Sequence, residues 1–556
     1  MSLRNALGLC LRVVLLAAAY ATAAPAAAPK LQVEVYKGGF ASVNSFIFSN
    51  GHSLLVMDVQ RKAGEASKLV DLIKAKHLPL TTILISHGHT DHFTGMALLH
   101  AEFPQARIVV ASEAIKRDIK AYAIYMDQGG ATGAEPALDP ALRPRSVQNP
   151  GGFDYEHTIE VLGTNTVTLE GGGTLELTSD YPPTEAAHMT TVYSKDLNAL
   201  FLADLGYNRV HPWMGDDIDS ERVSKWRSEL LRIKAKYAAL NPRVYPGHGD
   251  PTDRGLFDRM VRYIDDFTRI TAAAPSTEEA MRNMQVLYPD YEQADFFLKY
   301  SVENHVRAAS VDSAVRAERQ WLMMVRTVNT DATREKQFNE WYDRIDIPDV
   351  LEVPGYWRAR RGQTLPESTS NGAAGAASSG EVGHYVALYN IGSPAIDKTI
   401  IDMLMASWNM DRVGRGTDLI KVVERVYFGQ YSAPVSPPGR SANGRSHFLF
   451  VERFGVADSR DYKQFNAWYD AHYQRAAASV PGVIHATRYE LYRVLMFEPQ
   501  SAPRFLTLYE IDADSVEEAR HAAAELTQVD ERDRSRAGYV GAAPTLYAEL
   551  RDVEGR

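Results

Sequence analysis

The chain has 556 residues, of which 45% are hydrophobic and 23% charged, and its formal net charge is −10. A single hydrophobic core stops growing near about 250–300 residues, so we expect two to four domains. The acidic balance excludes a nucleic-acid backbone as the main partner, because a surface that follows phosphates is basic. A small-molecule substrate is compatible with this charge.

The N-terminal residues are typical of an export signal. Arg4 and Arg12 are its charges, and the apolar stretch Leu11 to Ala19 is short for a membrane span. We predict a signal peptide over residues 1–23, a periplasmic or secreted protein, and no stable membrane insertion after processing. An uncleaved anchoring helix is the alternative. The single cysteine, Cys10, lies inside this signal, so no disulfide is expected.

Residues 30–310 are predicted to form one domain in which short strands alternate with amphipathic helices. Strands are expected at 30–36, 43–48, 54–59, 82–86, 108–110, 158–162, 166–169, 174–178, 190–194 and 198–203. Helices are expected at 63–76, 95–102, 112–126, 219–237, 254–273, 277–285 and 293–308. Two sets of strands with flanking helices indicate a layered α/β architecture.

One motif follows the apolar strand Thr82 to Ser86 and carries most of the chemistry. It contains His87, His89, Asp91 and His92 within six consecutive residues. Imidazole and carboxylate groups are ligands of divalent metals such as zinc. Strand ends and loops are also where catalytic groups gather, so the motif predicts a metal site at the end of this strand.

Three later residues extend the candidate site. His188 follows the predicted strand 174–178 and a short loop, and Asp204 ends the apolar run 198–203. His248 stands between two glycines, which permit tight turns and close backbone approach.

Together these residues resemble the motifs of the metallo-β-lactamase superfamily over about residues 31–270. The resemblance rests on Asp58, the His-rich run, His188, Asp204 and Pro246-Gly247-His248-Gly249. It implies an αββα sandwich with the metal site at one edge of the paired sheets. It also implies a ligand set: a first metal bound by His87, His89 and His188, a second bound by Asp91, His92 and His248, and Asp204 bridging both. Asp58 would brace the His-rich loop.

The same resemblance implies a hydrolase with two zinc ions that cleaves an ester, lactone or amide (β-lactam-like) bond, and the predicted signal peptide makes this an exported enzyme. Asp91 would pass a proton to the leaving group. Tyr207 follows Asp204 with the spacing found in dinuclear acyl-homoserine lactonases, where the phenol donates to the substrate; a packing aromatic is the alternative. The major β-lactamase subclass has cysteine at the position of Asp204, so the sequence is closer to the lactonase, thioesterase and phosphodiesterase branches.

The metal identity stays open, because iron or manganese also suits these ligands. The alternative function is therefore a mononuclear iron oxidoreductase of the persulfide dioxygenase type. A non-enzymatic binding protein with a decayed metal site is a third reading, which the complete ligand set opposes.

The C-terminal part contains an internal repeat. Lys336 to Asn339, Trp341 to Asp343 and Val353 to Gly355 recur 127 residues later as Lys463 to Asn466, Trp468 to Asp470 and Val480 to Gly482. The motif resembles EthD-like dimeric α/β-barrel modules, which implies ferredoxin-like repeats over 319–432 and 446–552. They would serve in substrate binding or in forming a homo-oligomer; the alternative is that the repeated aromatic residues are only core.

Overall fold

The computed structural model describes residues 31–127, 138–146, 149–215, 218–310, 315, 318–365, 384–437, 446–456, 462–492, 503–528, 539–541 and 544–555. The predicted signal peptide, residues 1–23, lies outside the described residues and stays a prediction. In the part of the chain that is described, no helix combines the length and the apolar character needed to cross a membrane.

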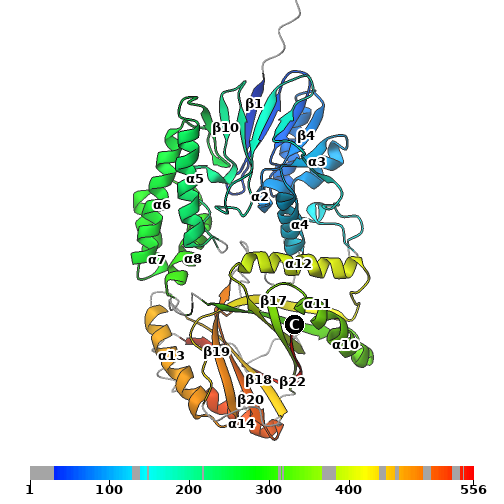
Figure 1. Ribbon diagram of the computed structural model, residues 1–556, viewed down its shortest axis with the longest axis vertical. Helices are drawn as coiled ribbons and strands as arrows, with labels where there is room; N and C mark the ends of the chain where they lie inside the picture. Colours follow the sequence, from blue (N-terminus) through cyan, green and yellow to red (C-terminus); the bar gives the residue numbers. More distant parts are fainter. Residues whose placement is uncertain are drawn as a thin grey trace, which may run out of the picture.

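Two β-sheets form the centre of the N-terminal domain (Figure 1). The first sheet has the order β1 (Gln32–Lys37), β2 (Asn44–Ser49), β3 (Leu54–Met57), β4 (Leu80–Leu84), β5 (Arg107–Val110) and β6 (Ile159–Val161). The second has the order β12 (Arg243–Tyr245), β10 (Ala199–Phe201), β9 (Thr191–Ser194), β8 (Thr174–Thr178) and β7 (Thr166–Thr168). A short parallel pair joins β11 (Tyr207–Asn208) to β13 (His248–Gly249).

The alternation of side chains along β2 shows how the layers form. Phe46 and Phe48 point to one face and contact Phe201 of the second sheet, with ring centroids 5.0 and 4.9 Å apart. Ile47 points to the other face and joins the core under the helices of the first sheet. Successive strand residues face opposite sides, so one strand serves both cores.

Helices cover the outer faces of both sheets. The first sheet is covered by α1 (Ala63–Lys74), α3 (Met96–Glu102) and α4 (Glu113–Asp127), and the second by α5 (Ser220–Lys236) and α6 (Gly255–Ala273). The remaining helices of this part are α2 (Thr90–Phe93), α7 (Thr277–Leu287) and α8 (Lys299–Ser310). The predicted layered α/β architecture is confirmed, with helix, sheet, sheet and helix in succession.

The C-terminal part is a closed barrel of eight strands. Their order is β20 (Phe505–Ala513), β19 (Val483–Tyr492), β17 (Ile420–Gln430), β14 (Gln320–Asn329), β16 (Tyr385–Gly392), β15 (Tyr356–Thr364), β22 (Thr545–Glu554) and β18 (Ser446–Val456), and β18 pairs again with β20. The short strand β21 (Tyr539–Gly541) adds to β18. Outside the strands lie α10 (Glu335–Trp341), α11 (Ile347–Leu351), α12 (Ile396–Arg412), α13 (Tyr462–Ser479) and α14 (Val516–Leu526).

The internal repeat reappears as two equivalent sets of contacts. In the first copy, buried Arg361 donates to Asn339 Oδ1 at 2.5 Å and to Asp343 Oδ1 at 3.3 Å. In the second copy, buried Arg488 donates to Asp470 Oδ1 at 2.7 Å and also to Asn466. Each arginine joins a strand to the helix that covers it, so the repeated motif has the same structural role twice.

Candidate metal centre

Every element that carries a candidate ligand ends at the same edge of the sheets. The His-rich run follows β4, and α2 begins inside it at Thr90. Asp204 follows β10, and His248 follows β12, which pairs with β10 in parallel. Parallel strands place their carboxyl ends together, so Asp204 and His248, 44 positions apart in the sequence, meet at this edge of the second sheet. The His-rich run comes from the first sheet and lies against them where the two sheets pack.

Two groups of buried side chains lie there with ligand atoms close enough to share metal ions. Within each group the ligand atoms lie within 4.8 Å of one another. The first group contains His87, His89, Glu185 and Asp204, and the second contains Asp91, His92 and His248. Six of the seven predicted ligands lie in these groups; His188 does not, and Glu185 was not predicted.

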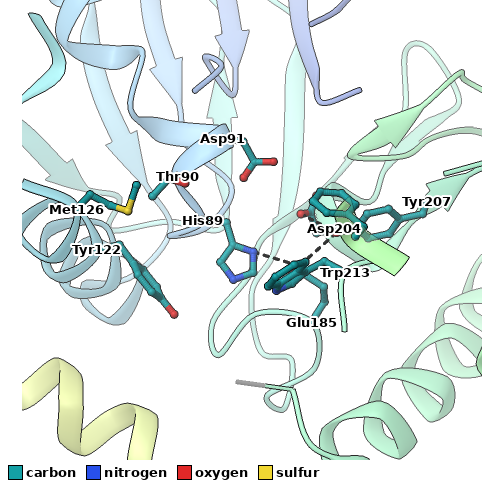
Figure 2. Close-up of a pocket in the computed structure, with 10 residues that line it drawn as sticks. His89, Thr90, Asp91, Tyr122, Met126, Glu185, Asp204, Tyr207 and Trp213 are labelled. Carbon is teal, nitrogen blue, oxygen red and sulfur yellow. Dashed lines mark hydrogen bonds and ion pairs between the residues drawn. The ribbon is translucent and has the colours of Figure 1, made fainter. Parts of the chain in front are cut away.

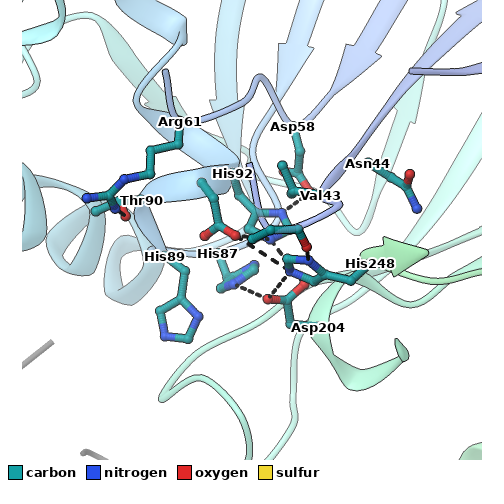
Figure 3. Close-up of polar contacts among 12 residues, drawn as sticks. Val43, Asn44, Asp58, Arg61, His87, His89, Thr90, His92, Asp204 and His248 are labelled. Atoms are coloured by element: carbon teal, nitrogen blue, oxygen red, sulfur yellow. Dashed lines mark hydrogen bonds and ion pairs between the residues drawn. The ribbon is translucent and has the colours of Figure 1, made fainter. Parts of the chain in front are cut away.

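Asp204 belongs to the first group and also faces the second (Figure 3). Its Oδ2 is 3.6 Å from Nε2 of His87 in the first group and 3.2 Å from Nε2 of His248 in the second. Its Oδ1 is 3.1 Å from Nε2 of His92. Oδ2 of Asp204 thus faces both groups, while Oδ1 faces the second group only. The bridging of two metal ions by this carboxylate stays a prediction.

The histidine rings are oriented by their other nitrogen atoms. Nδ1 of His92 donates to Asp58 at 2.8 Å, Nδ1 of His248 donates to the backbone oxygen of Ala41 at 2.8 Å, and Nδ1 of His87 contacts Ser86 Oγ at 2.9 Å. Each contact leaves Nε2 directed at Asp204. Metal-binding histidines are commonly fixed in this way through the second nitrogen, so the donor set fits divalent metal ions.

The buried carboxylates of the centre raise the pKa of His92 and of His248, and so favour positive charge at these two rings. Burial alone would raise the pKa of Asp204, but the charges of His92 and His248 hold that pKa well below its ordinary value. Burial would likewise lower the pKa of His92, yet Asp204, Asp58 and Asp91 raise it well above its ordinary value. Carboxylates that attract a proton to these nitrogen atoms attract a divalent cation to the same place. Burial lowers the pKa of His87 to about 4, which keeps this ring neutral.

His188 lies beside the centre but its side chain has another partner. Its neighbour Met189 pairs with the backbone of His87, while Nδ1 of His188 lies 2.7 Å from Oδ2 of Asp118 on α4. The side chain of His188 is 38% exposed, whereas that of Glu185 is buried. Oε1 of Glu185 lies 3.1 Å from Nδ1 of His89, so among the described residues Glu185, and not His188, has a ligand atom within the first group. His188 as a metal ligand stays a prediction.

Asp58 braces the His-rich loop, as the resemblance implies. It accepts hydrogen bonds from the backbone nitrogen and Oγ of Ser86, both at 2.8 Å, besides the one from His92. Its backbone φ of 60° lies in the left-handed region, which asparagine and aspartate tolerate better than most residues.

Substitution of Asp58 is expected to weaken metal binding. Asp58→Asn keeps a residue suited to the backbone but removes the charge, and loss of such an outer partner costs about 10–100-fold in metal affinity. Asp58→Ala should lose at least as much and should also lower the midpoint of thermal unfolding. Competition with a metal-sensitive chelator measures the affinity, and unchanged affinity in Asp58→Ala would contradict the bracing role.

Tyr207 closes one side of the centre. Its ring stacks on His248 with centroids 4.7 Å apart. Its single hydroxyl proton is shared between two acceptors, Asp204 Oδ2 at 3.1 Å and Glu185 Oε1 at 3.2 Å. Burial, together with Asp204 and Glu185, raises the pKa of Tyr207 well above its ordinary value. The phenol therefore stays protonated and acts as a hydrogen-bond donor.

A pocket opens onto the two groups (Figure 2). Tyr122 and Met126 of α4 form one side, Trp213 and Tyr207 lie on the other, and His89 lies between them. Phe297, Thr90, Asp91, Glu185 and Asp204 complete the lining. A pocket with aromatic walls and a few polar groups at its base is typical of a small-molecule site.

Comparison with known families agrees with this geometry. Residues 42–248 match the family described as the metallo-beta-lactamase superfamily. This stretch is a metallo-beta-lactamase superfamily domain. The match covers the His-rich run, Asp204 and His248, while the C-terminal barrel lies outside it.

Solved structures similar to the superfamily domain include the metallo-beta-lactamase from Pontibacter korlensis, at 17% identity and a TM-score of 0.31, covering 42% of this chain and 95% of that one. The FIM-1 metallo-beta-lactamase from Pseudomonas aeruginosa, in its mono-zinc form, matches at 14% identity and a TM-score of 0.30, covering 42% and 90%. No curated protein matches the chain.

Proposed function

We propose that the chain is an exported metal-dependent hydrolase that cleaves an ester, lactone or amide bond in a small molecule. The observation that carries the proposal is the pair of buried ligand groups joined by Asp204 at the base of an aromatic-walled pocket. Zinc bound by these groups would polarise a carbonyl and lower the pKa of water to about 7, so that hydroxide is available at neutral pH.

The residues of the pocket have defined tasks in this proposal. Asp204 holds the two groups at a fixed spacing, and Asp91 transfers a proton to the leaving group. Tyr207 stays protonated and donates to the carbonyl or leaving oxygen of the substrate, beside His248. The aromatic walls receive an apolar part of the substrate and exclude water from the reacting bond.

The proposal extends to the parts that the comparisons leave open. Export rests on the apolar segment Leu11 to Ala19 and the small residues after it. Ferredoxin-like, EthD-like character of the C-terminal repeats is supported by the 127-residue repeat and by the closed barrel. The resemblance to D-x-x-Y enzymes favours lactones among the candidate substrates.

Metal removal tests the central claim. We expect one metal ion per ligand group by mass spectrometry, loss of hydrolysis on chelation, and recovery with zinc. The assay uses a panel of lactones, β-lactams, thioesters and phosphodiesters. Metal-loaded protein that turns over none of them would overturn the proposal, and a single iron with oxygen consumption would favour the persulfide dioxygenase alternative. The second complete group, Asp91, His92 and His248, argues against that one-metal alternative.

A further inference from the structure

Helix α4 of the metallo-beta-lactamase superfamily domain lines the pocket, packs against the loop that carries His87 and His89, and contacts α12 of the first C-terminal repeat. Tyr122 and Met126, one turn apart on α4, line the pocket. On the same helix, Asp118 packs against the metal loop so closely that a Cβ on Gly88 would lie 2.7 Å from Cβ of Asp118. A shift of α4 therefore moves the pocket wall and presses on the loop that carries His87 and His89.

The first C-terminal repeat holds α4 from outside. Helix α12 lies between α4 and the barrel (Figure 1), and the two helices are in contact. Trp408 of α12 places its ring under Nζ of buried Lys120, 3.9 Å from the ring centroid. Lys120 also pairs with Glu156, which fixes the ammonium group from the side of the superfamily domain.

The hydrophobic cores of the two parts interpenetrate at this contact. Ile401 of α12 is buried in the core under the first sheet, and Met405 packs against that core. In the opposite direction, Tyr125 and Met126 of α4 are buried in the core of the first repeat, together with Ile400 and Leu404. Met126 thus contacts the repeat and lines the pocket.

We propose that α12 positions α4 and thereby sets the shape of the apolar pocket wall, so that the first C-terminal repeat determines which apolar substrate groups the metal centre accepts. Trp408 is a positioning residue in this scheme, because it acts on the substrate through Lys120 and α4. The specificity part of this inference rests on the proposed hydrolase function, whereas the coupling of α12 to α4 does not.

The full-length, metal-loaded protein tests the inference through Trp408→Ala. Loss of a partly desolvated cation–π contact changes the equilibrium between the packed and the opened helix by about three- to tenfold. We therefore expect the rate of amide hydrogen exchange over residues 113–127 to rise by about three- to tenfold. KM should rise for substrates with large apolar groups and stay unchanged for small ones, with kcat and metal content preserved. Lys120→Met removes the same contact from α4 itself and serves if Trp408→Ala fails to fold.

Trp357→Ala is the matched control, because Trp357 lies in the same repeat on β15 and is 41% exposed. It should alter neither the exchange nor KM. Unchanged exchange over 113–127 in both contact variants overturns the inference, whatever the substrate. If hydrogen exchange over 113–127 becomes faster but KM changes equally for small and large substrates, the first C-terminal repeat does not determine specificity, and that part of the inference is overturned. If the wild-type protein hydrolyses nothing, the proposed function fails, and the exchange measurement still decides whether α12 positions α4.

Discussion

Asp204→Asn is expected to cause the largest loss of activity of any single substitution in this chain. The change keeps the shape of the side chain but removes the charge that faces Nε2 of both His92 and His248. Metal content should fall below one ion per ligand group. Loss of several kcal/mol of charge stabilisation at the reacting bond corresponds to about three orders of magnitude or more in rate.

The measurement is metal content and kcat/KM on whichever substrate of the panel the wild-type protein hydrolyses. Asp196→Asn is the control, since this exposed carboxylate lies in the turn between β9 and β10 and should change neither quantity. An Asp204→Asn protein that keeps full metal content and most of its activity would show that the carboxylate does not bridge the two groups.

Substitution of Gly247, whose backbone lies against Asp204, should disturb the centre as much as substitution of the Asp204 side chain. A Cβ on Gly247 would lie 2.1 Å from Oδ1 of Asp204 and 2.7 Å from the backbone of Ala203. Glycine at this position is therefore required by close approach, as the sequence analysis argued for the turn around His248.

The elements of the superfamily domain could be predicted because their signals are local. The predicted strands 82–86 and 198–203 each end directly before a candidate ligand. The strands found in the structure, β4 and β10, end three residues before His87 and Asp204, at Leu84 and Phe201. Parallel pairing within each sheet sets the direction of these ends. The packing of one sheet on the other, which brings the ends of β4 and β10 together, is implied only by the family resemblance. The internal repeat was also visible, because the 127-residue offset has no gap.

The place of Glu185 in the first group could not be predicted, because burial in an irregular loop leaves no periodic signal. Glu185 lies in the stretch between β8 and β9, where nothing in the sequence distinguishes it from an exposed carboxylate. The partner of His188 is Asp118, 70 residues earlier on α4, and such a pair is visible only after folding. The contact of Trp408 with Lys120 could not be predicted either, because these residues are far apart in the sequence and meet only after folding.

Glu185 and His188 therefore make the sharpest comparison that this centre offers. If the first metal is held as the structure places the side chains, Glu185→Gln should lose that ion, since it removes a charge 3.1 Å from Nδ1 of His89. His188→Asn should keep the ion and lose only the contact with Asp118. Its metal affinity should fall by no more than about 10–100-fold, the loss that follows removal of an outer partner. The two residues are three positions apart in one loop, so each variant is the control for the other.

Metal content after dialysis, together with binding of cobalt(II) followed by its visible absorption, distinguishes the outcomes. Loss of the first ion in His188→Asn and its retention in Glu185→Gln would reverse the assignment. The imidazole would then have to leave Asp118 when metal binds. Asp118→Ala, which removes the acceptor that faces Nδ1 of His188, should therefore change metal affinity as well. Retention of both ions in His188→Asn instead leaves a first group with two histidines and two carboxylates. Such a group holds more negative charge than the His-rich set that the resemblance implies, so it binds hard divalent ions such as manganese more readily than that set does.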